Sequence, residues 1–471
     1  MPHRSRRYLH MAGALALASG SLLAGGAPAA ATASIAIGPM MTSKFVSSKQ
    51  PPTQAQCEAT FTAPCYVPAQ LETAYNEQPL FSSGITGKGQ TIVIVDSFGS
   101  PTIQSDLATF DATFNLPAPP SFKIIQPAGP VPAYDPTNAN GDVSWAGETT
   151  LDVEWSHAMA PGASILLVET PVAETEGTAG FPQIIKAENY VVNHHLGQVI
   201  SQSFGATEPT FPSPASIYAL RSAYLNAARN HVTVLAATGD GGATDYSNTA
   251  GTLLYTHPAV DWPSTDPLVT AVGGTQLALL SDGSRTQADR VWNDSVNYAL
   301  NNAFFGTPGP TATATGGGLS TVFPRPSYQD SVAGLVGDHR GVPDIAMSAA
   351  CSGLVDTYQS FGGEPAGWYV ACGTSEATPL FAGIVALADQ EAGHSLGLIN
   401  PALYAMSAAH APGIVDVTTG NNSVEFLQPT LVTVQGYQAG PGYDLASGVG
   451  TVNAALFVPE LAQAAGGGYG G

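Results

Sequence analysis

Residues 372–387 read CGTSEATPLFAGIVAL and place a serine, Ser375, at the start of an apolar helical pattern. The apolar side chains recur at helical spacing: Phe381, Ile384, Val385 and Leu387. Unpaired N–H groups and the helix macrodipole favour negative charge at such a position. A nucleophilic serine benefits from this, because an oxyanion develops beside it during acyl transfer. Taken alone, the pattern fits equally well a serine in the first turn of an ordinary buried helix.

Outward from this helix, apolar strands alternate with helical segments. We expect strands at 91–95, 164–169, 199–205 and 232–242, and helices at 100–115, 147–163, 181–193, 215–230, 400–408 and 452–465. This alternation predicts an α/β fold with a mostly parallel central sheet and helices on both faces. Sites in such sheets lie beyond the carboxyl ends of the strands, where Asp96, Ser203 and Asp240 fall.

The two ends of the chain differ in composition from the part between them. Arg4, Arg6 and Arg7 precede an apolar run and then small residues, so we expect a secretory signal peptide at 1–33. Ser5-Arg6-Arg7 also partly resembles a twin-arginine signal. Residues 34–64, rich in Ser, Thr, Pro and Gln, are expected to be a leader or linker. One folded domain is expected over 65–465, followed by a Gly-rich tail at 466–471.

The composition limits the partners that this chain can have. Only 10% of the residues are charged, and the formal net charge is −21. Such a surface repels nucleic acid and anionic membranes, so we expect neither as a partner. The carboxylates would lose much of this charge at low pH, which suits acidic surroundings. Together with the expected signal peptide, this favours a secreted, extracellular protein, which we expect to be a monomer.

Four cysteines are present: Cys57, Cys65, Cys351 and Cys372. An even number in an exported chain favours disulfides, and the spacings do not suggest a zinc site. Four cysteines allow three pairings, of which we expect Cys57–Cys65 with Cys351–Cys372.

A nucleophilic serine needs a base, and two carboxylates compete with a histidine for that role. Glu148 and Asp152 are four residues apart in the expected helix 147–163, so they share one face. Functional sites often hold such strained like charges, although solvated acids near a helix N-terminus are also common. His157 lies roughly 140° round the helix from Asp152, so it would need a different face turned inward.

Two further aspartates follow expected strands. Asp240 stands in a TGDGG turn, where the glycines allow close approach of a substrate. Asp96 is placed to orient a base. The ordinary alternative for both is an aspartate that stabilises a turn.

Taken together, these segments resemble the sedolisin family, the serine-carboxyl peptidases, over most of the chain from Tyr66 to Val458. The motifs follow the family's order: GETTLDVEW (147–155), ISQSFG (200–205), ATGDGG (237–242), AVGGT (271–275), GGGLSTVFPRPSYQ (316–329), GVPDIA (341–346), CGTSEATP (372–379), VDVTTG (415–420) and AGPGYDLASG (439–448). The resemblance implies a subtilisin-like fold, without the HGTH-type histidine helix of true subtilisins.

The resemblance also implies four catalytic roles. Ser375 is the nucleophile, Glu148 the base that takes its proton, and Asp152 the residue that orients Glu148. Asp240 is protonated and donates a hydrogen bond to the oxyanion. The chemistry agrees, because an ordinary glutamate is a usable base only in acid, and a donating aspartate must be kept neutral by burial.

A calcium site is implied as well. Oxygen ligands from flexible loops suit Ca²⁺. The resemblance assigns them to the carboxylates and backbone carbonyls of five residues, which would hold one structural ion: Asp416, Val417, Gly440, Gly442 and Asp444.

The predicted function is a secreted, acid-active serine-type endopeptidase acting on proteins or peptides. Members of the family usually carry a long N-terminal pro-domain, whereas here only residues 34–64 separate the expected signal from the domain. Either the pro-domain is dispensable or supplied separately, or the activity is controlled differently. Three alternatives stay open: tripeptidyl-type exopeptidase action, a non-catalytic secreted binding protein on the same fold, and a Ser-His-Asp hydrolase that uses His157.

Overall fold

The computed structural model of the chain describes residues 41–466, so the expected signal peptide and nearly all of the expected Gly-rich tail lie outside the described residues. An eight-stranded sheet forms the centre, in the order β11-β10-β8-β6-β3-β5-β4, with β14 also paired to β10. Its strands are β3 (Thr91–Ser97), β4 (Phe122–Ile125), β5 (Ser164–Thr170), β6 (Val199–Gln202), β8 (Thr233–Ala237), β10 (Thr270–Gln276), β11 (Arg290–Val291) and β14 (Ile345–Ser348). Every pairing is parallel except that of β10 with β11, which confirms the predicted α/β architecture.

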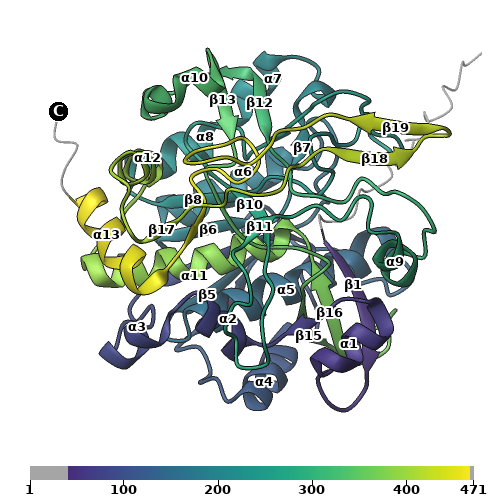
Figure 1. Cartoon of the computed structure of the whole chain (residues 1–471). Helices are drawn as coiled ribbons and strands as arrows, with labels where there is room; N and C mark the ends of the chain where they lie inside the picture. Colours follow the sequence, from purple (N-terminus) through teal and green to yellow (C-terminus); the bar gives the residue numbers. More distant parts are fainter. Residues whose placement is uncertain (1–40, 467–471) are drawn as a thin grey trace, which may run out of the picture. The chain divides into compact units, whose positions relative to one another are not determined.

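Helices cover both faces of this sheet because its strands are apolar on both sides. Along β3, Ile92 and Ile94 face one hydrophobic cluster and Val93 and Val95 face another, as the alternation of a strand requires. The first face is covered by α5 (Ser144–Met159), α11 (Thr374–Ala392) and α13 (Ala454–Gly466), and the second by α6 (Phe181–Asn193), α7 (Pro214–Leu220) and α8 (Ser222–Arg229). Figure 1 shows α11 running beside α13 across the sheet.

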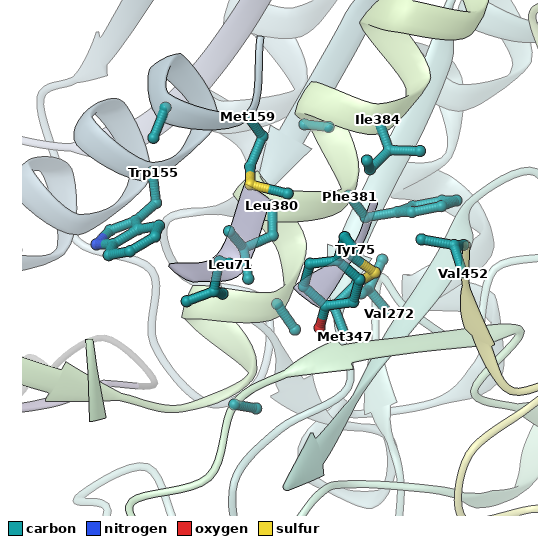
Figure 2. Packing of buried hydrophobic residues seen from close by; sticks show 14 of the residues in the cluster. Leu71, Tyr75, Trp155, Met159, Val272, Met347, Leu380, Phe381, Ile384 and Val452 are labelled. Atoms are coloured by element: carbon teal, nitrogen blue, oxygen red, sulfur yellow. The ribbon is translucent and has the colours of Figure 1, made fainter. Parts of the chain in front are cut away.

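The core around α11 is built from distant parts of the chain (Figure 2). Leu380, Phe381 and Ile384 of α11 are fully buried, and they pack in one cluster with Trp155 and Met159 of α5. Burying such side chains contributes roughly 1.5–3 kcal/mol each. This packing fixes α11 against α5, the two helices that carry Ser375 and Glu148.

The expected helix over 215–230 is two helices instead, α7 and α8. They meet at Arg221, whose guanidinium forms two hydrogen bonds with the carboxylate of Asp266, at 2.6 and 2.9 Å. The helical pattern on either side of this residue does not reveal the break.

A second sheet lies next to the start of α11 and has the order β1-β16-β15-β2. Its strands are β1 (Thr42–Ser47), β2 (Cys65–Tyr66), β15 (Leu354–Gln359) and β16 (Gly367–Cys372). Because β1 pairs with β16 and is followed by α1 (Gln54–Phe61), the expected leader or linker is part of the folded domain from residue 41 onward.

Both expected disulfides are present, Cys57–Cys65 and Cys351–Cys372. The first fastens α1 to β2. The second joins the segment after β14 to the end of β16, directly before Gly373. Both bonds therefore support the sheet from which α11 begins.

The remaining elements complete the layers around the two sheets: α2 (Pro68–Ala74), α3 (Gln78–Ser83), α4 (Ile103–Phe114), α9 (Tyr298–Leu300), α10 (Ala333–Val336), α12 (Asn400–Ala408), β7 (Ala206–Thr207), β9 (Asp261–Trp262), β12 (Gly318–Pro324), β13 (His339–Val342), β17 (Ile414–Val415), β18 (Val424–Leu427), β19 (Leu431–Val434) and β20 (Thr451–Val452). Within residues 41–466, no helix has both the length and the apolar composition needed to cross a bilayer.

Candidate active site

Ser375 is the second residue of α11 and is fully buried. Gly373 precedes the helix with a φ of 130°, a conformation that favours glycine and turns the chain from β16 into α11. The Ser375 hydroxyl contacts the backbone carbonyl of Ser203 at 3.4 Å, and the serine lies close enough to Glu148 to influence the pKa of that carboxyl. The serine thus lies at a helix N-terminus beside a carboxylate, as predicted.

Glu148 and Asp152 project from the same face of α5, as their spacing predicts. Both side chains are fully buried. Asp152 accepts a hydrogen bond of 2.7 Å from the Ser203 hydroxyl at the end of β6. The same hydroxyl lies 3.4 Å from the backbone carbonyl of Ser375, so Ser203 links the carboxylate pair to the serine.

A third buried carboxyl, Asp96 at the end of β3, interacts electrostatically with both acids of α5. Burial, then Asp152 and Asp96, raises the pKa of Glu148 well above its ordinary value, while the nearby Ser375 hydroxyl opposes that shift. Burial and the Glu169 carboxylate raise the pKa of Asp96 to about 7, against the opposing effect of the nearby Thr149 hydroxyl. Carboxyls packed this closely cannot all ionise cheaply, so they hold and exchange protons as a group.

Asp240 also lies at the N-terminus of α11. Its Oδ1 accepts hydrogen bonds from the Thr374 backbone N–H at 2.7 Å and from the Thr374 hydroxyl at 2.8 Å. Burial raises the pKa of Asp240 to about 8, although both bonds from Thr374 oppose the shift. At acid pH this carboxyl is therefore neutral and has a proton to donate.

His157 occupies a different environment at the far end of α5. Its Nε2 lies 2.8 Å from the Pro117 carbonyl oxygen and 3.4 Å from Asp111 Oδ1. Burial lowers its pKa to about 4. These contacts place the ring against Pro117 and Asp111, while Glu148 is the residue that meets the serine.

A cavity of about 300 Å³ adjoins the site. Asp240 and Gly205 form part of its wall, together with Cys372 at the end of the strand that leads to Ser375. Met41 and Thr42 also line it, so the start of the described chain lies beside the cavity. Of the four residues predicted to be catalytic, Asp240 is the one that lines this cavity, while Ser375, Glu148 and Asp152 are fully buried.

Sequence reasoning placed Ser203 at a strand end but gave it no role, and it missed Thr374 and the acids of the cavity wall, Glu174 and Glu176. Glu174 and Glu176 follow β5 at the carboxyl edge of the sheet, the same signal that singled out Asp96 and Asp240.

The five residues expected to bind calcium lie in neighbouring loops. Gly442 N–H donates to Asp416 Oδ2 at 2.8 Å, and Gly440 N–H donates to Asp444 Oδ2 at 3.1 Å. The Ser447 hydroxyl lies 3.4 Å from the Val417 carbonyl and 3.0 Å from Asp444 Oδ1. This all-oxygen set of two carboxylates and backbone carbonyls fits a hard cation such as Ca²⁺.

Asp356 also lies close to the sulfurs of Cys57 and Cys65. Those two sulfurs form a disulfide and are therefore not thiolate ligands. We do not regard this group as a metal site.

Comparison with known proteins agrees with this architecture. The sequence profile of the subtilase family matches residues 133–409. Kumamolisin of Bacillus sp. (strain MN-32) is 34% identical over 394 residues, which cover 82% of this chain and 62% of the relative. Sedolisin of Pseudomonas sp. (strain 101) is 29% identical over 411 residues, which cover 85% of this chain and 62% of the relative. The chain thus spans 62% of the length of each of these two relatives.

A solved structure supports the same relationship. It is Pseudomonas sedolisin, a serine-carboxyl proteinase complexed with two molecules of pseudo-iodotyrostatin, and it matches with a TM-score of 0.66 and 26% identity. The match covers 84% of this chain and 97% of the solved chain. Human tripeptidyl-peptidase 1 is 30% identical over 326 residues, covering 65% of this chain and 50% of the relative. The chain therefore belongs to the subtilase family, and within it to the sedolisin type.

Proposed function

We propose that this protein is a secreted, acid-active serine-carboxyl endopeptidase that hydrolyses peptide bonds of proteins or peptides. The observation that carries the proposal is that Ser375, at the start of α11, lies beside the buried Glu148 carboxyl and influences its pKa. A buried serine that faces a carboxylate at a helix N-terminus has the parts needed for acyl transfer. The sequence similarity to kumamolisin and sedolisin supports the same chemistry.

The proposed reaction assigns one task to each group. Glu148 takes the proton of Ser375 as the serine oxygen bonds to the substrate carbonyl carbon, and Asp152 holds Glu148 in position. The protonated Asp240 donates a hydrogen bond to the oxyanion. Glu148 then passes its proton to the leaving amine as the peptide C–N bond breaks, and water cleaves the acyl-enzyme by the same steps in reverse.

Degradation of a denatured protein, followed from roughly pH 3 to pH 8, tests this proposal. We expect cleavage with its maximum in acid. Product masses separate the two modes of action, because an endopeptidase yields internal fragments of varied length and a tripeptidyl peptidase releases three residues at a time from the N-terminus. Absence of any cleavage over this range would contradict the peptidase proposal.

The proposed roles predict a bell-shaped dependence of rate on pH. The lower limb reports ionisation of the set of interacting carboxyls to which Glu148 belongs, and the pKa of Glu148 is raised above 4.5. The upper limb reports loss of the Asp240 proton, and the pKa of Asp240 is about 8 before substrate binds. Activity should therefore rise through mild acid and be lost as the pH passes the Asp240 pKa.

Asp240→Asn tests the origin of the upper limb. Asparagine cannot ionise but keeps N–H donors, so we expect a slower enzyme whose upper limb moves to higher pH. The rate profile of purified wild type and variant provides the measurement, with Asp389→Asn as a control, because Asp389 is buried in α11 away from the cavity wall. An active variant with an unmoved upper limb would remove the oxyanion role of Asp240.

We further propose that one structural Ca²⁺ binds the loops that carry Asp416 and Asp444. An ion that binds only the folded state stabilises it by about 2.7 kcal/mol when its free concentration is 100 times Kd. Chelation or Asp416→Ala should therefore lower the melting temperature by several degrees. Glu364→Ala, which removes an exposed acid outside these loops, should not. An equal melting temperature with and without bound metal would contradict the site.

A further inference from the structure

The buried acids that surround the candidate site do not end with Asp96. Asp96 and Glu169 are directly opposed on the neighbouring parallel strands β3 and β5. Two residues earlier, the opposed pair Ile94 and Leu167 lies in the hydrophobic cluster beneath α5, so Asp96 and Glu169 also face α5. Helix α5 packs against both strands (Figure 1). Glu169 is therefore the next carboxyl after Asp96 on the face of the sheet that carries the candidate site.

Glu169 differs from the site acids Glu148, Asp152 and Asp96, which are fully buried, because it lines a second cavity. The volume of this cavity is about 190 Å³. The polar residues of its wall are Ser100, Gln126, Tyr134, Asp142 and Glu169. A polar cavity of this size admits water. Glu169 is therefore the acid through which this set of carboxyls meets solvent on the side of β5.

Two neighbours hold the Glu169 carboxyl in place. Gln126 Nε2 donates a hydrogen bond to Glu169 Oε2 at 2.7 Å, and the Val131 N–H donates to Gln126 Oε1 at 3.1 Å. On the other side, Glu169 Oε1 lies against Gly99, where an added Cβ atom would come within 2.1 Å of it. The φ of Gly99 is 75°, a conformation that favours glycine. The carboxyl is thus fixed beside the end of β3.

Asp96 and Glu169 lie among other acids. The titratable side chains around them are Glu148 and Asp152 from α5, and Asp142 and Tyr134 from the cavity wall. Among the described residues, no lysine, arginine or histidine lines the second cavity. Like charges this close cannot all ionise cheaply, so a charge on one carboxyl decides whether its neighbour keeps a proton.

Glu169 acts on the proposed base through Asp96. Burial, together with the charge of Glu169, raises the pKa of Asp96 to about 7, so Asp96 keeps its proton at acid pH. The charges that raise the pKa of Glu148 are those of Asp152, Asp96 and Asp240. A protonated Asp96 removes one of these charges, which makes Glu148 easier to ionise.

Resting on the peptidase function proposed above, we propose that Glu169 is a positioning residue of the active site. Its carboxylate keeps the proton on Asp96, so that negative charge collects on Glu148, the base. Because Glu169 meets water in the second cavity, a charge there costs less than a charge on a fully buried acid.

Glu169→Gln tests this role, because glutamine has the same size and can still accept the hydrogen bond from Gln126. Without the charge, Asp96 should ionise at lower pH, and its own charge should then oppose the ionisation of Glu148. We expect the lower limb of the kcat/KM profile to move to higher pH by about 0.5 unit or more, which is less than the 1–3 units that a directly adjacent charge produces. A lower limb that stays in place or moves to lower pH would overturn the inference.

Three further variants separate the charge from the structure. Glu169→Asp keeps a carboxylate beside Asp96, so its lower limb should stay close to that of wild type. The double variant Asp96→Asn, Glu169→Gln should have the same lower limb as Asp96→Asn alone. Glu188→Gln, which changes a buried acid of α6 on the other face of the sheet, should leave the limb in place. If Glu169→Gln moved the limb equally with and without Asp96, the effect would not pass through Asp96 and the inference would be wrong.

Thermal melts test the link without any hydrolysis. At roughly pH 7 both carboxyls ionise in wild type, so Asp96→Asn and Glu169→Gln each relieve the same repulsion. The gain in melting temperature of the double variant should therefore fall short of the sum of the two single gains. At roughly pH 4, where both carboxyls are protonated, the gains should be additive.

The melts also separate this inference from the peptidase proposal. If wild type hydrolysed no peptide but the gains at the higher pH were not additive, the peptidase proposal would fail and the link between Glu169 and Asp96 would stand. Additive gains at both pH values would overturn the link whether or not hydrolysis occurs.

Discussion

Ser375→Ala is expected to lower kcat/KM for peptide hydrolysis on the order of 10⁶-fold, the size of effect found when a serine nucleophile is removed. The Ser375 oxygen is the atom proposed to form the acyl-enzyme, and an alanine methyl group cannot replace it. The fold should persist, because alanine is the best helix former and fits the space of the serine at the start of α11. Initial rates of peptide hydrolysis and thermal melts, each measured for wild type and Ser375→Ala, provide the test.

Thr378→Ala provides the matched control for this variant. Thr378 is also buried in the first turns of α11, and its hydroxyl donates to the backbone carbonyl of Thr374 at 2.9 Å. It should melt close to wild type and keep most of the activity. If Ser375→Ala instead hydrolysed peptides at the wild-type rate, the nucleophile would lie elsewhere and the reaction proposed above would be wrong.

The central sheet could be predicted because its strands carry their own signal. Residues 91–95 are almost entirely apolar, which is typical of a parallel strand buried on both faces. The chain then alternates such runs with helical patterns, and that order implies right-handed crossovers and a doubly covered sheet. Local pattern and global fold agree here, so the sequence was sufficient.

The region before residue 65 shows where local patterns fail. Strand β1 is polar and half-exposed, and its partner β16 lies more than three hundred residues away in the sequence. Helix α1 has little amphipathic character and is anchored by the Cys57–Cys65 disulfide. Long-range pairing and a covalent bond hold these elements, and neither leaves a periodic signal in a single sequence.

Some parts of the candidate site could likewise be predicted from the sequence, and others could not. Glu148 and Asp152 could be paired from their helical spacing, and the motif order linked them to Ser375 and Asp240. The link through Ser203 could not be predicted, because it depends on a hydroxyl at the end of β6 meeting a side chain of α5. The acidic cavity wall likewise combines loops whose proximity only the folded chain reveals.

Glu148→Gln is expected to lower kcat/KM by roughly 10²–10⁴-fold, the range for loss of a general base. Glutamine has the size of glutamate and can still accept a hydrogen bond from Ser375, but it cannot take the proton. The variant should fold at least as well as wild type near neutral pH. A glutamate whose pKa is raised on folding loses stability as the pH rises through that pKa, and a neutral glutamine removes this loss.

Two controls make this test decisive between the possible bases. Glu154→Gln alters another buried acid of α5, one that accepts the Tyr358 N–H at 3.0 Å, and it should keep most of the activity. His157→Ala removes the ring that contacts Pro117 and should likewise cost little by comparison with Glu148→Gln. The reverse ranking, with His157→Ala the more damaging, would favour a Ser-His-Asp mechanism.

The pH profile of the residual activity adds an independent criterion. In wild type the rate rises along the lower limb as Glu148 and the carboxyls that interact with it ionise, because only the ionised base can take the serine proton. Glutamine has no such ionisation, so the lower limb of Glu148→Gln should flatten while the upper limb, set by Asp240, stays in place. A lower limb that is unchanged in shape and position would mean that another group is the base, even if the rate had fallen.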